Sequence, residues 1–571
     1  MSTRSWPTAE LTRHFFREFF YVGFLTDLGA DSFLRVMISL LAGVLSLGLL
    51  VPIVFFRKYV DLAALPRPEA YRRAVLGDQL FMLCVAMFIL ALVAAVICQS
   101  LFPSETDFRI LVPLPVTRRA VFGAKLLALA IVTSTFVFAT NLAIGPVFPA
   151  ISGGRWAQAP LESRLMAHTT SSLLASIFAV SSVLSTQGLI AVFVPRRWLR
   201  LASVTAQTLT VSGLMLALPF ITRAPAQGAL IQSHPGWLYA TPPGWFLGLE
   251  QVLLGSRDVY FLRLFWIGIA ASAFCAASTG ACYLILYRRF DQVVLRASPS
   301  LSSPRTAWLR RLSAIGRLHP AQAAMVEFIA AALGRSRLHQ LVFAGTSACA
   351  LAIAANSLLA VGIVELFVGQ GERSRVLLLF ADWTPLLVIF VAVRVLRDTL
   401  RLPLEIRANW IFKMTEDDAV RGHQLDAVRL VLFFLGVIPA ATLFFPVQIL
   451  AFGGLRACCW MVLTLLIGRV LVDCTLIGWR SIPFTCAYAP GKRHVIPTIL
   501  MTLAAFFAFI AIGSASVRSG TAGPSSFIVW LGIFSGAIAG VRRYRLRALG
   551  RLPLEFEDIP DDLQLLQLTP R

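Results

Sequence analysis

Long runs of apolar residues alternate with short polar connections along almost the whole chain. A membrane-spanning helix needs about 20 predominantly apolar residues, because each helical residue advances about 1.5 Å through a hydrocarbon core about 30 Å thick. This pattern predicts an all-α polytopic membrane protein with twelve spans, and the division between the ninth and tenth spans is placed near Pro446. The spans lie near residues 36–56, 79–101, 121–150, 168–194, 201–222, 259–287, 339–363, 378–396, 428–446, 448–479, 494–514 and 525–541.

The longest connection, 288–338, separates six spans from six. It contains a Ser/Pro/Arg stretch typical of a linker, followed by a segment with the composition of a short helix. The layout indicates an internal duplication or a fused dimer. We therefore predict an amphipathic cytoplasmic N-terminal segment at 1–35, a first six-span half at 36–287, a cytoplasmic basic linker with a short helix at 288–338, a second six-span half at 339–541 and a cytoplasmic C-terminal tail at 542–571.

The first 20 residues mix charged and aromatic side chains before any apolar run begins, which is not the pattern of a cleavable signal. The pattern favours a helix that lies at the cytoplasmic membrane surface, with Phe15, Phe16, Phe19 and Phe20 turned to lipid. A frayed tail is the alternative.

Composition and charge support the membrane assignment. The chain has 571 residues, of which 57% are apolar and 14% charged, and its mean hydropathy of +0.76 excludes an ordinary soluble fold. The net charge of +22 would suggest nucleic acid in a soluble protein. With the N-terminus inside, however, 36 lysines and arginines fall in cytoplasmic connections and 14 in external ones. The surplus therefore predicts cytoplasmic termini and contact with anionic lipid headgroups, and no nucleic-acid partner.

One external connection departs from this rule. The segment 57–78 carries Arg57, Lys58, Arg67, Arg72 and Arg73. Either this loop is cytoplasmic and a span has been miscounted, or the remaining connections determine the topology. We favour the second interpretation.

Motifs for enzymatic chemistry are missing from the sequence. It contains no phosphate-binding P-loop and no zinc-protease or serine-hydrolase signature, and its nine cysteines include no CxxC pair. We therefore expect no metal, no cofactor and no catalysis by this chain. The acidic triplet Glu416–Asp418 fits either a metal-binding site of a membrane transferase or the capped start of a helix after Thr415, and we favour the cap.

Polar residues inside apolar runs are candidates for a translocation path, because an unpaired polar group is costly in hydrocarbon. Arg469 and Asp473 stand one helical turn apart, a spacing that favours mutual neutralisation over substrate binding. The candidates are Asn141, Gln187, Gln207, Asn356, Arg469 and Asp473.

The connection after the second predicted span reads FPSETDFRILVPLPVTRRAVFGAKLL. Pro113 and Pro115 interrupt any helix there, and Thr117 suits the cap of the helix that follows. Such an elbow presents a rigid surface to a cytoplasmic partner. An ordinary loop with arginines that reach the lipid headgroups would have the same composition.

This segment resembles the first cytoplasmic loop of permeases in the second ABC transporter superfamily, the exporter class. The residues that carry the resemblance are Asp107, Leu111, Leu114, Pro115, Val116, Arg118, Ala124 and Lys125. In that family the loop docks on the ATPase subunit and passes its motion to the spans. The resemblance thus implies a coupling role for Asp107, Leu114, Pro115, Arg118, Arg119 and Lys125.

Two further segments extend the resemblance. Permeases of this class carry short re-entrant or interfacial helices between the fifth and sixth spans of a half, and here that connection contains HPGWLYATPPGWFLGLEQVLLG. In the second half, the connection after the eighth span occupies the place of the first coupling loop. Pro403, Asn409 and Trp410 are its candidate coupling residues.

The sequence therefore predicts a multi-pass permease of the bacterial inner membrane that works, alone or as a homodimer, with a separate cytoplasmic ABC-type ATP-binding subunit. The expected cargo is hydrophobic or lipid-like. The alternatives are an ion-coupled secondary transporter that uses Asp473, a metal-dependent membrane transferase that uses Glu416–Asp418, and a scaffold that transports nothing.

Overall fold

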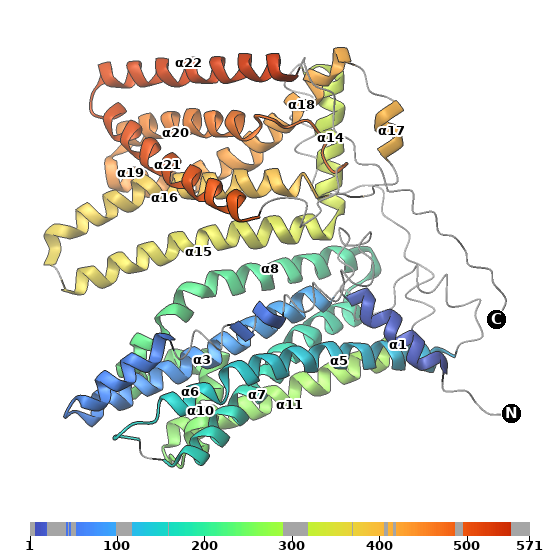
Figure 1. Cartoon of the computed structure of the whole chain (residues 1–571), viewed down its shortest axis with the longest axis vertical. Helices are drawn as coiled ribbons and strands as arrows, with labels where there is room; N and C mark the ends of the chain where they lie inside the picture. Colours follow the sequence, from blue (N-terminus) through green and yellow to red (C-terminus); the bar gives the residue numbers. More distant parts are fainter. Residues whose placement is uncertain are drawn as a thin grey trace. The chain divides into compact units, whose positions relative to one another are not determined.

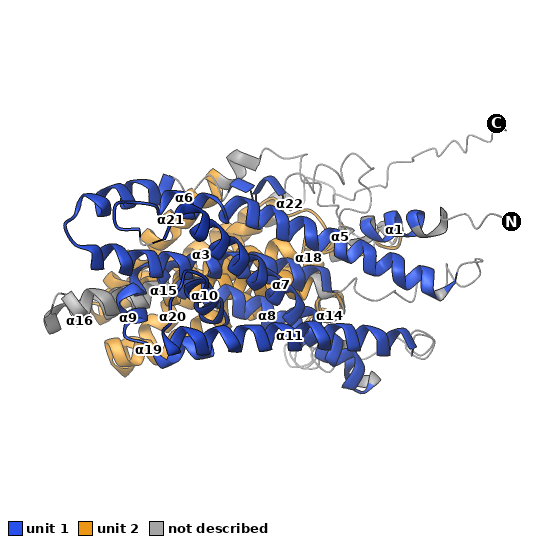
Figure 2. Cartoon of the chain, turned by 90° about the horizontal axis from the view of Figure 1, so that it is seen from below, with its two compact units in different colours: residues 1–299 blue, residues 300–571 orange. Residues whose placement is uncertain are grey.

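The computed structural model divides the chain into two compact units, residues 1–299 and 300–571 (Figure 2). The boundary between them falls within the predicted linker 288–338. All regular elements among the described residues are helices, so the fold is that of an all-α polytopic membrane protein, as predicted. The structure describes residues 6–19, 41–43, 45–46, 53–98, 117–157, 159–288, 318–367, 369–402, 404, 409–414, 418–485 and 495–549.

Nine helices in these ranges are long and apolar enough to cross a membrane, or up to ten if the bent pair 320–334 and 339–355 forms one span. Much of the first predicted span, 36–56, lies outside the described residues. The total of twelve spans therefore stays a prediction, whereas a multi-pass membrane protein is established.

In unit 1, five long helices run side by side (Figure 1). A helical segment at 53–64 precedes them. The elements are α1 (Trp6–Phe19), α3 (Pro68–Ile97), α5 (Arg118–Ile144), α6 (Val147–Ile151), α7 (Leu161–Phe193), α8 (Arg196–Arg223), η2 (Ala224–Gln227), α9 (Gly228–Gln232), η3 (Gly236–Ala240), α10 (Pro242–Leu253) and α11 (Val259–Arg288).

Short helices fill the connection between α8 and α11, as the resemblance implied. α10 does not lie free at the surface: it packs against α3, α7 and α11, and its Phe246 and Leu247 are fully buried. Gly248 makes this packing possible, since a Cβ there would stand 2.5 Å from the Cβ of Leu264. The connection is therefore folded back into the helix bundle.

The N-terminal helix α1 packs along α5. The prediction that Phe15 faces lipid is wrong: its side chain is fully buried, and the ammonium group of Lys125 on α5 lies 4.7 Å from the centre of its ring. The apolar face of α1 is thus covered, in part, by protein. Phe19 and Phe20 lie outside the residues whose side chains are described.

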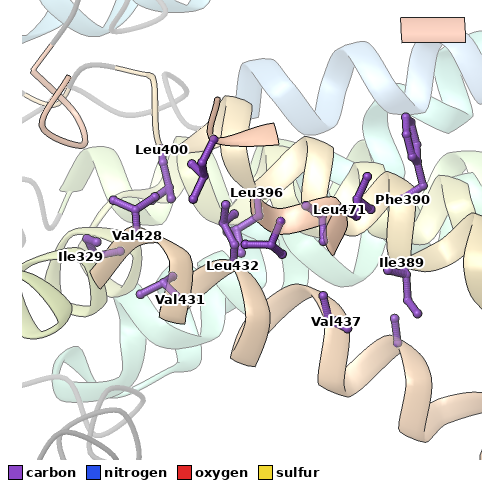
Figure 3. Close-up of a cluster of buried hydrophobic side chains, with 14 of the residues drawn as sticks. Ile329, Ile389, Phe390, Leu396, Leu400, Val428, Val431, Leu432, Val437 and Leu471 are labelled. Atoms are coloured by element: carbon purple, nitrogen blue, oxygen red, sulfur yellow. The ribbon is translucent and has the colours of Figure 1, made fainter. Parts of the chain in front are cut away.

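In unit 2, α16 lies at the centre and packs against α15, α19, α20 and α21. Its buried face meets α14, α18 and α19 in one apolar core (Figure 3). The elements are α14 (Pro320–Arg335), α15 (Arg337–Phe367), α16 (Gly369–Thr399), α17 (Asn409–Met414), α18 (Asp418–Leu432), η6 (Phe433–Val437), α19 (Ile438–Phe452), α20 (Gly454–Thr475), α21 (Val495–Gly520) and α22 (Pro524–Leu549).

The predicted division near Pro446 is wrong. Pro446 lies inside α19, and the chain turns at Gly453, whose φ of 83° and ψ of 159° end that helix. This backbone conformation is accessible essentially to glycine alone. The division between the two spans is therefore fixed by Gly453.

Candidate functional site

Unit 1 contains a cavity of about 370 Å³ among α3, α6, α7, α9 and α10 and the connections between them. It lies at the end of the unit where α3 and α7 begin and α10 returns, an end predicted to be external. Its wall combines guanidinium, imidazole, carboxylate and aromatic groups, including Arg72, Trp156, Arg164, His168 and Glu250.

The innermost charged groups of this wall are His168 on α7 and Glu250 on α10. The His168 Nδ1 lies 3.0 Å from the Glu250 Oε1, and each residue is 1% exposed. The other two polar atoms, the His168 Nε2 and the Glu250 Oε2, are buried and have no hydrogen-bond partner among the described residues. Such groups are costly to bury unpaired.

A second buried carboxylate, Asp78 on α3, lies one residue before the cavity residue Gln79. The Lys58 Nζ is 2.7 Å from both of its oxygens, and the Tyr59 hydroxyl donates to one of them at 2.7 Å. Burial, with the nearby Asp78 carboxylate, raises the pKa of Tyr59. The hydroxyl therefore stays protonated as a donor, and Asp78 is fully paired.

The basic segment 57–78 lies at the same end of unit 1 as two other connections that are predicted external. The Arg73 Nε donates to the Gln232 Oε1 at 2.9 Å, and the Trp156 indole donates to the Leu65 carbonyl at 3.1 Å. Segment 57–78 and these two connections therefore lie at the same end of unit 1. Within this segment Lys58 is neutralised by Asp78, which reduces the charge that conflicts with the positive-inside rule.

Unit 2 contains an ion cluster of Asp426, Arg429, Arg469, Asp473 and Arg545, which come from α18, α20 and α22. The predicted pair forms: the Arg469 Nε lies 3.3 Å from the Asp473 Oδ2. However, Arg429 and Arg545 also approach Asp473, at 4.0 Å and 3.9 Å. Three guanidinium groups share two carboxylates, so the cluster carries a formal charge of +1.

A second cavity, of about 710 Å³, lies between α16, α20, α21 and α22. Its walls are mainly apolar, with Phe390, Met501 and Phe509 among the lining residues. Arg394, Arg397 and Arg401 line it near the end of α16. The cavity therefore has a basic border and an apolar interior.

The three predicted path residues of unit 1 are not brought together in one place. The Asn141 Nδ2 donates to the Ser176 hydroxyl at 3.0 Å, the Gln187 Oε1 accepts from Ser203 at 2.8 Å, and the Gln207 Nε2 donates to the Ala95 carbonyl at 2.6 Å. All three link neighbouring helices of unit 1. The side chain of Asn356 lies outside the described residues.

Of the predicted coupling residues, Lys125 is buried in contact with α1, and Arg119 is exposed at the first turn of α5. The Thr117 Oγ1 accepts from the Ala120 amide at 3.3 Å, so Thr117 caps α5 as predicted. The remaining candidates lie outside the described residues or have undescribed side chains: Asp107, Leu114, Pro115, Arg118, Pro403, Asn409 and Trp410.

The acidic triplet meets the start of α18 at Asp418, while Glu416 and Asp417 lie outside the described residues. Among the residues searched, no group of three or more His, Cys, Asp or Glu side chains is placed to hold a metal ion.

The sequence did not single out His168, Glu250 or Asp78. Each is an ionisable residue in or beside an apolar run, and this pattern could have identified all three as candidate functional residues. Their partners are distant in sequence, since 82 residues separate His168 from Glu250. Only the folding of α10 back onto α7 places them together.

Comparisons of the chain with protein-family models, with curated proteins and with solved structures gave no match.

Proposed function

We propose that this chain is the transmembrane permease component of an ATP-driven, ABC-type exporter, coupled to a separate cytoplasmic ATPase subunit. In this proposal both termini and the 99–119 segment face the cytoplasm of a bacterial cell. The chain binds no ATP itself. The partner hydrolyses ATP and thereby drives the movement of the spans.

The burial of Lys125 against α1 is the observation that carries the proposal. Lys125 is one of the residues of the resemblance, and it is 1% exposed beneath the Phe15 ring. A cation over an aromatic face, shielded from water, contributes about 2 kcal/mol. α1 and the first turns of α5 are therefore held as one body next to the proposed docking segment. A push on that segment would move the span α5 directly.

The folded connection between α8 and α11 supports the same proposal. In the exporter class that the sequence resembles, short helices occupy this position. Here η2 and α9 pack against α3, and α10 packs against α3, α7 and α11. Motion of the spans that start at the cytoplasmic end would therefore reach the cavity end of unit 1 through packed helices.

The proposed cargo is hydrophobic or lipid-like. Its support is the cavity of unit 2, where an apolar interior adjoins Arg394, Arg397 and Arg401. The Arg397 Nε donates to the Thr475 carbonyl at 2.7 Å, which holds that guanidinium in place at the border. An amphipathic anion matches such a surface, because its charge can meet the arginines while its chain lines the apolar wall.

Charge reversal at the proposed docking surface tests this function. A tagged chain with Arg118→Glu and Arg119→Glu should recover less of a P-loop ATPase from native membranes than the unaltered chain. The matched control is Arg257→Glu, at an exposed arginine beside α11 at the opposite end of unit 1. Equal recovery of the ATPase by all three chains would assign Arg118 and Arg119 to lipid headgroups and remove the docking role.

A further inference from the structure

The cavity of unit 1 has the features of a ligand site that the permease function does not explain. It is of the size typical of small-molecule sites, which enclose about 300–1,000 Å³. Two groups of its wall are more than nine-tenths buried and incompletely paired: the imidazole of His168 and the carboxylate of Glu250. A ligand that forms hydrogen bonds to the His168 Nε2 and the Glu250 Oε2 would remove the cost of burying these atoms unpaired.

The pairing of these two side chains defines what the ligand must bring. A carboxylate only accepts hydrogen bonds, so the His168 Nδ1–H donates a hydrogen bond to the Glu250 Oε1. In the neutral ring the Nε2 is then an acceptor, and the Glu250 Oε2 is an acceptor as well. Two acceptors beside a negative charge are complemented by a cation with several N–H donors. A primary ammonium group has three.

The opposite charge is present on the same wall. Arg72 and Arg164 both line the cavity, and the Nε of Arg164 is buried without a partner among the described residues. Gly153 makes room for the Arg164 guanidinium, because a Cβ at residue 153 would stand 2.5 Å from its Nη2. Guanidinium groups match phosphate oxygens in geometry as well as charge.

We propose that this cavity binds a zwitterion with a primary ammonium group and a phosphate, the chemistry of an ethanolamine phosphate ester. The ammonium lies at Glu250 and His168, and the phosphate lies at Arg164 and Arg72. The ligand is either the headgroup of a phospholipid at the membrane surface or a free water-soluble molecule. The site does not depend on coupling to an ATPase.

A methylation series on the unaltered protein tests the ammonium pocket. The full chain in detergent is titrated with phosphatidylethanolamine, its N-methyl and N,N-dimethyl forms and phosphatidylcholine, with bound lipid read by native mass spectrometry. Affinity should fall as N–H donors are lost, by about 10- to 100-fold over the series. Equal binding of all four lipids would overturn the proposal, and so would failure of all four lipids and of free O-phosphoethanolamine to bind.

Free O-phosphoethanolamine distinguishes the two sources of the ligand. If it displaces the bound lipid at comparable concentration, the site takes the soluble zwitterion; if only the lipid binds, the site takes the headgroup. Either result supports the proposed chemistry. Failure of both probes to bind removes it, whatever the outcome of the ATPase experiments.

Two variants separate the roles of the charged groups. Glu250→Gln should abolish the preference for ethanolamine over choline, whereas Arg164→Met should weaken both lipids alike, because both carry a phosphate. Glu162→Gln, at an exposed position in the first turn of α7, is the matched control and should bind as the unaltered chain does. An unchanged ethanolamine preference in a folded Glu250→Gln chain would contradict the proposal.

Discussion

Replacement of Asp473 by Asn should destabilise unit 2 rather than silence a transport step alone. Asp473 is 1% exposed and lies 3.3–4.0 Å from three guanidinium groups. Its neutralisation leaves those three arginines with Asp426 as their remaining partner in the cluster, and raises the formal charge of the cluster from +1 to +2. Removal of one partner from a buried ion pair costs about 3–5 kcal/mol. We expect about 3 kcal/mol, the lower end, because the Arg469 side chain is 19% exposed and can still reach water.

Removal of a positive charge should destabilise unit 2 less. Arg469→Gln leaves two guanidinium groups with two carboxylates, so its cost should be below about 1.5 kcal/mol. In the double variant Arg469→Gln with Asp473→Asn, the charge returns to +1 and part of the loss should be recovered. Arg456→Gln, at an exposed arginine on the same helix α20, is the control and should be neutral.

The assay is an unfolding titration of the four variants in SDS, followed by tryptophan fluorescence, with the coupling energy taken from the double-mutant cycle. Additive effects of Arg469→Gln and Asp473→Asn would refute the electrostatic reasoning. The result also decides how a transport assay must be read. An Asp473→Asn chain that loses transport is evidence for an ion-coupled carrier only if the double variant, which regains part of the lost stability, is inactive as well.

Three further substitutions test local packing. Lys125→Leu should loosen α1 from α5 by removing the cation over the Phe15 ring, and faster hydrogen exchange of α1 would show it; unchanged exchange would contradict the contact. Gly228→Val should displace α9 from α3, since a Cβ there would stand 1.8 Å from the Arg73 carbonyl oxygen, and proteolysis between α8 and α10 should increase; equal cleavage would refute it. Gly453→Ala should cost about 1–3 kcal/mol in the SDS titration, because its backbone conformation is accessible essentially to glycine alone; a neutral effect would contradict the turn at this residue.

The apolar runs predicted the helices well, because length and hydropathy are local properties of a sequence. Predicted spans such as 168–194 and 259–287 correspond to α7 and α11. Local signals also predicted the cap at Thr117. The turn at Gly453 was missed because a proline at residue 446 suggested a break, although a helix in a membrane protein can accommodate proline when neighbours satisfy the freed backbone group.

Features that depend on tertiary packing were not predictable in the same way. The aromatic face of α1 was assigned to lipid. An amphipathic pattern indicates that one face of a helix is buried, but it does not distinguish burial in lipid from burial against protein. Phe15 is covered by α5 instead. Likewise, Asp473 and Arg469 were found from their spacing on one helix, whereas Arg545 comes from α22 and joins them only in the folded unit.

A separate ATPase that drives this chain should be detectable as ATP hydrolysis in a preparation purified from native membranes through a tag on the chain. We expect ATP hydrolysis that co-purifies with the chain and is lost together with a P-loop subunit when Arg118 and Arg119 are changed to Glu. A pure, folded chain from native membranes with neither ATP hydrolysis nor a P-loop subunit would contradict it.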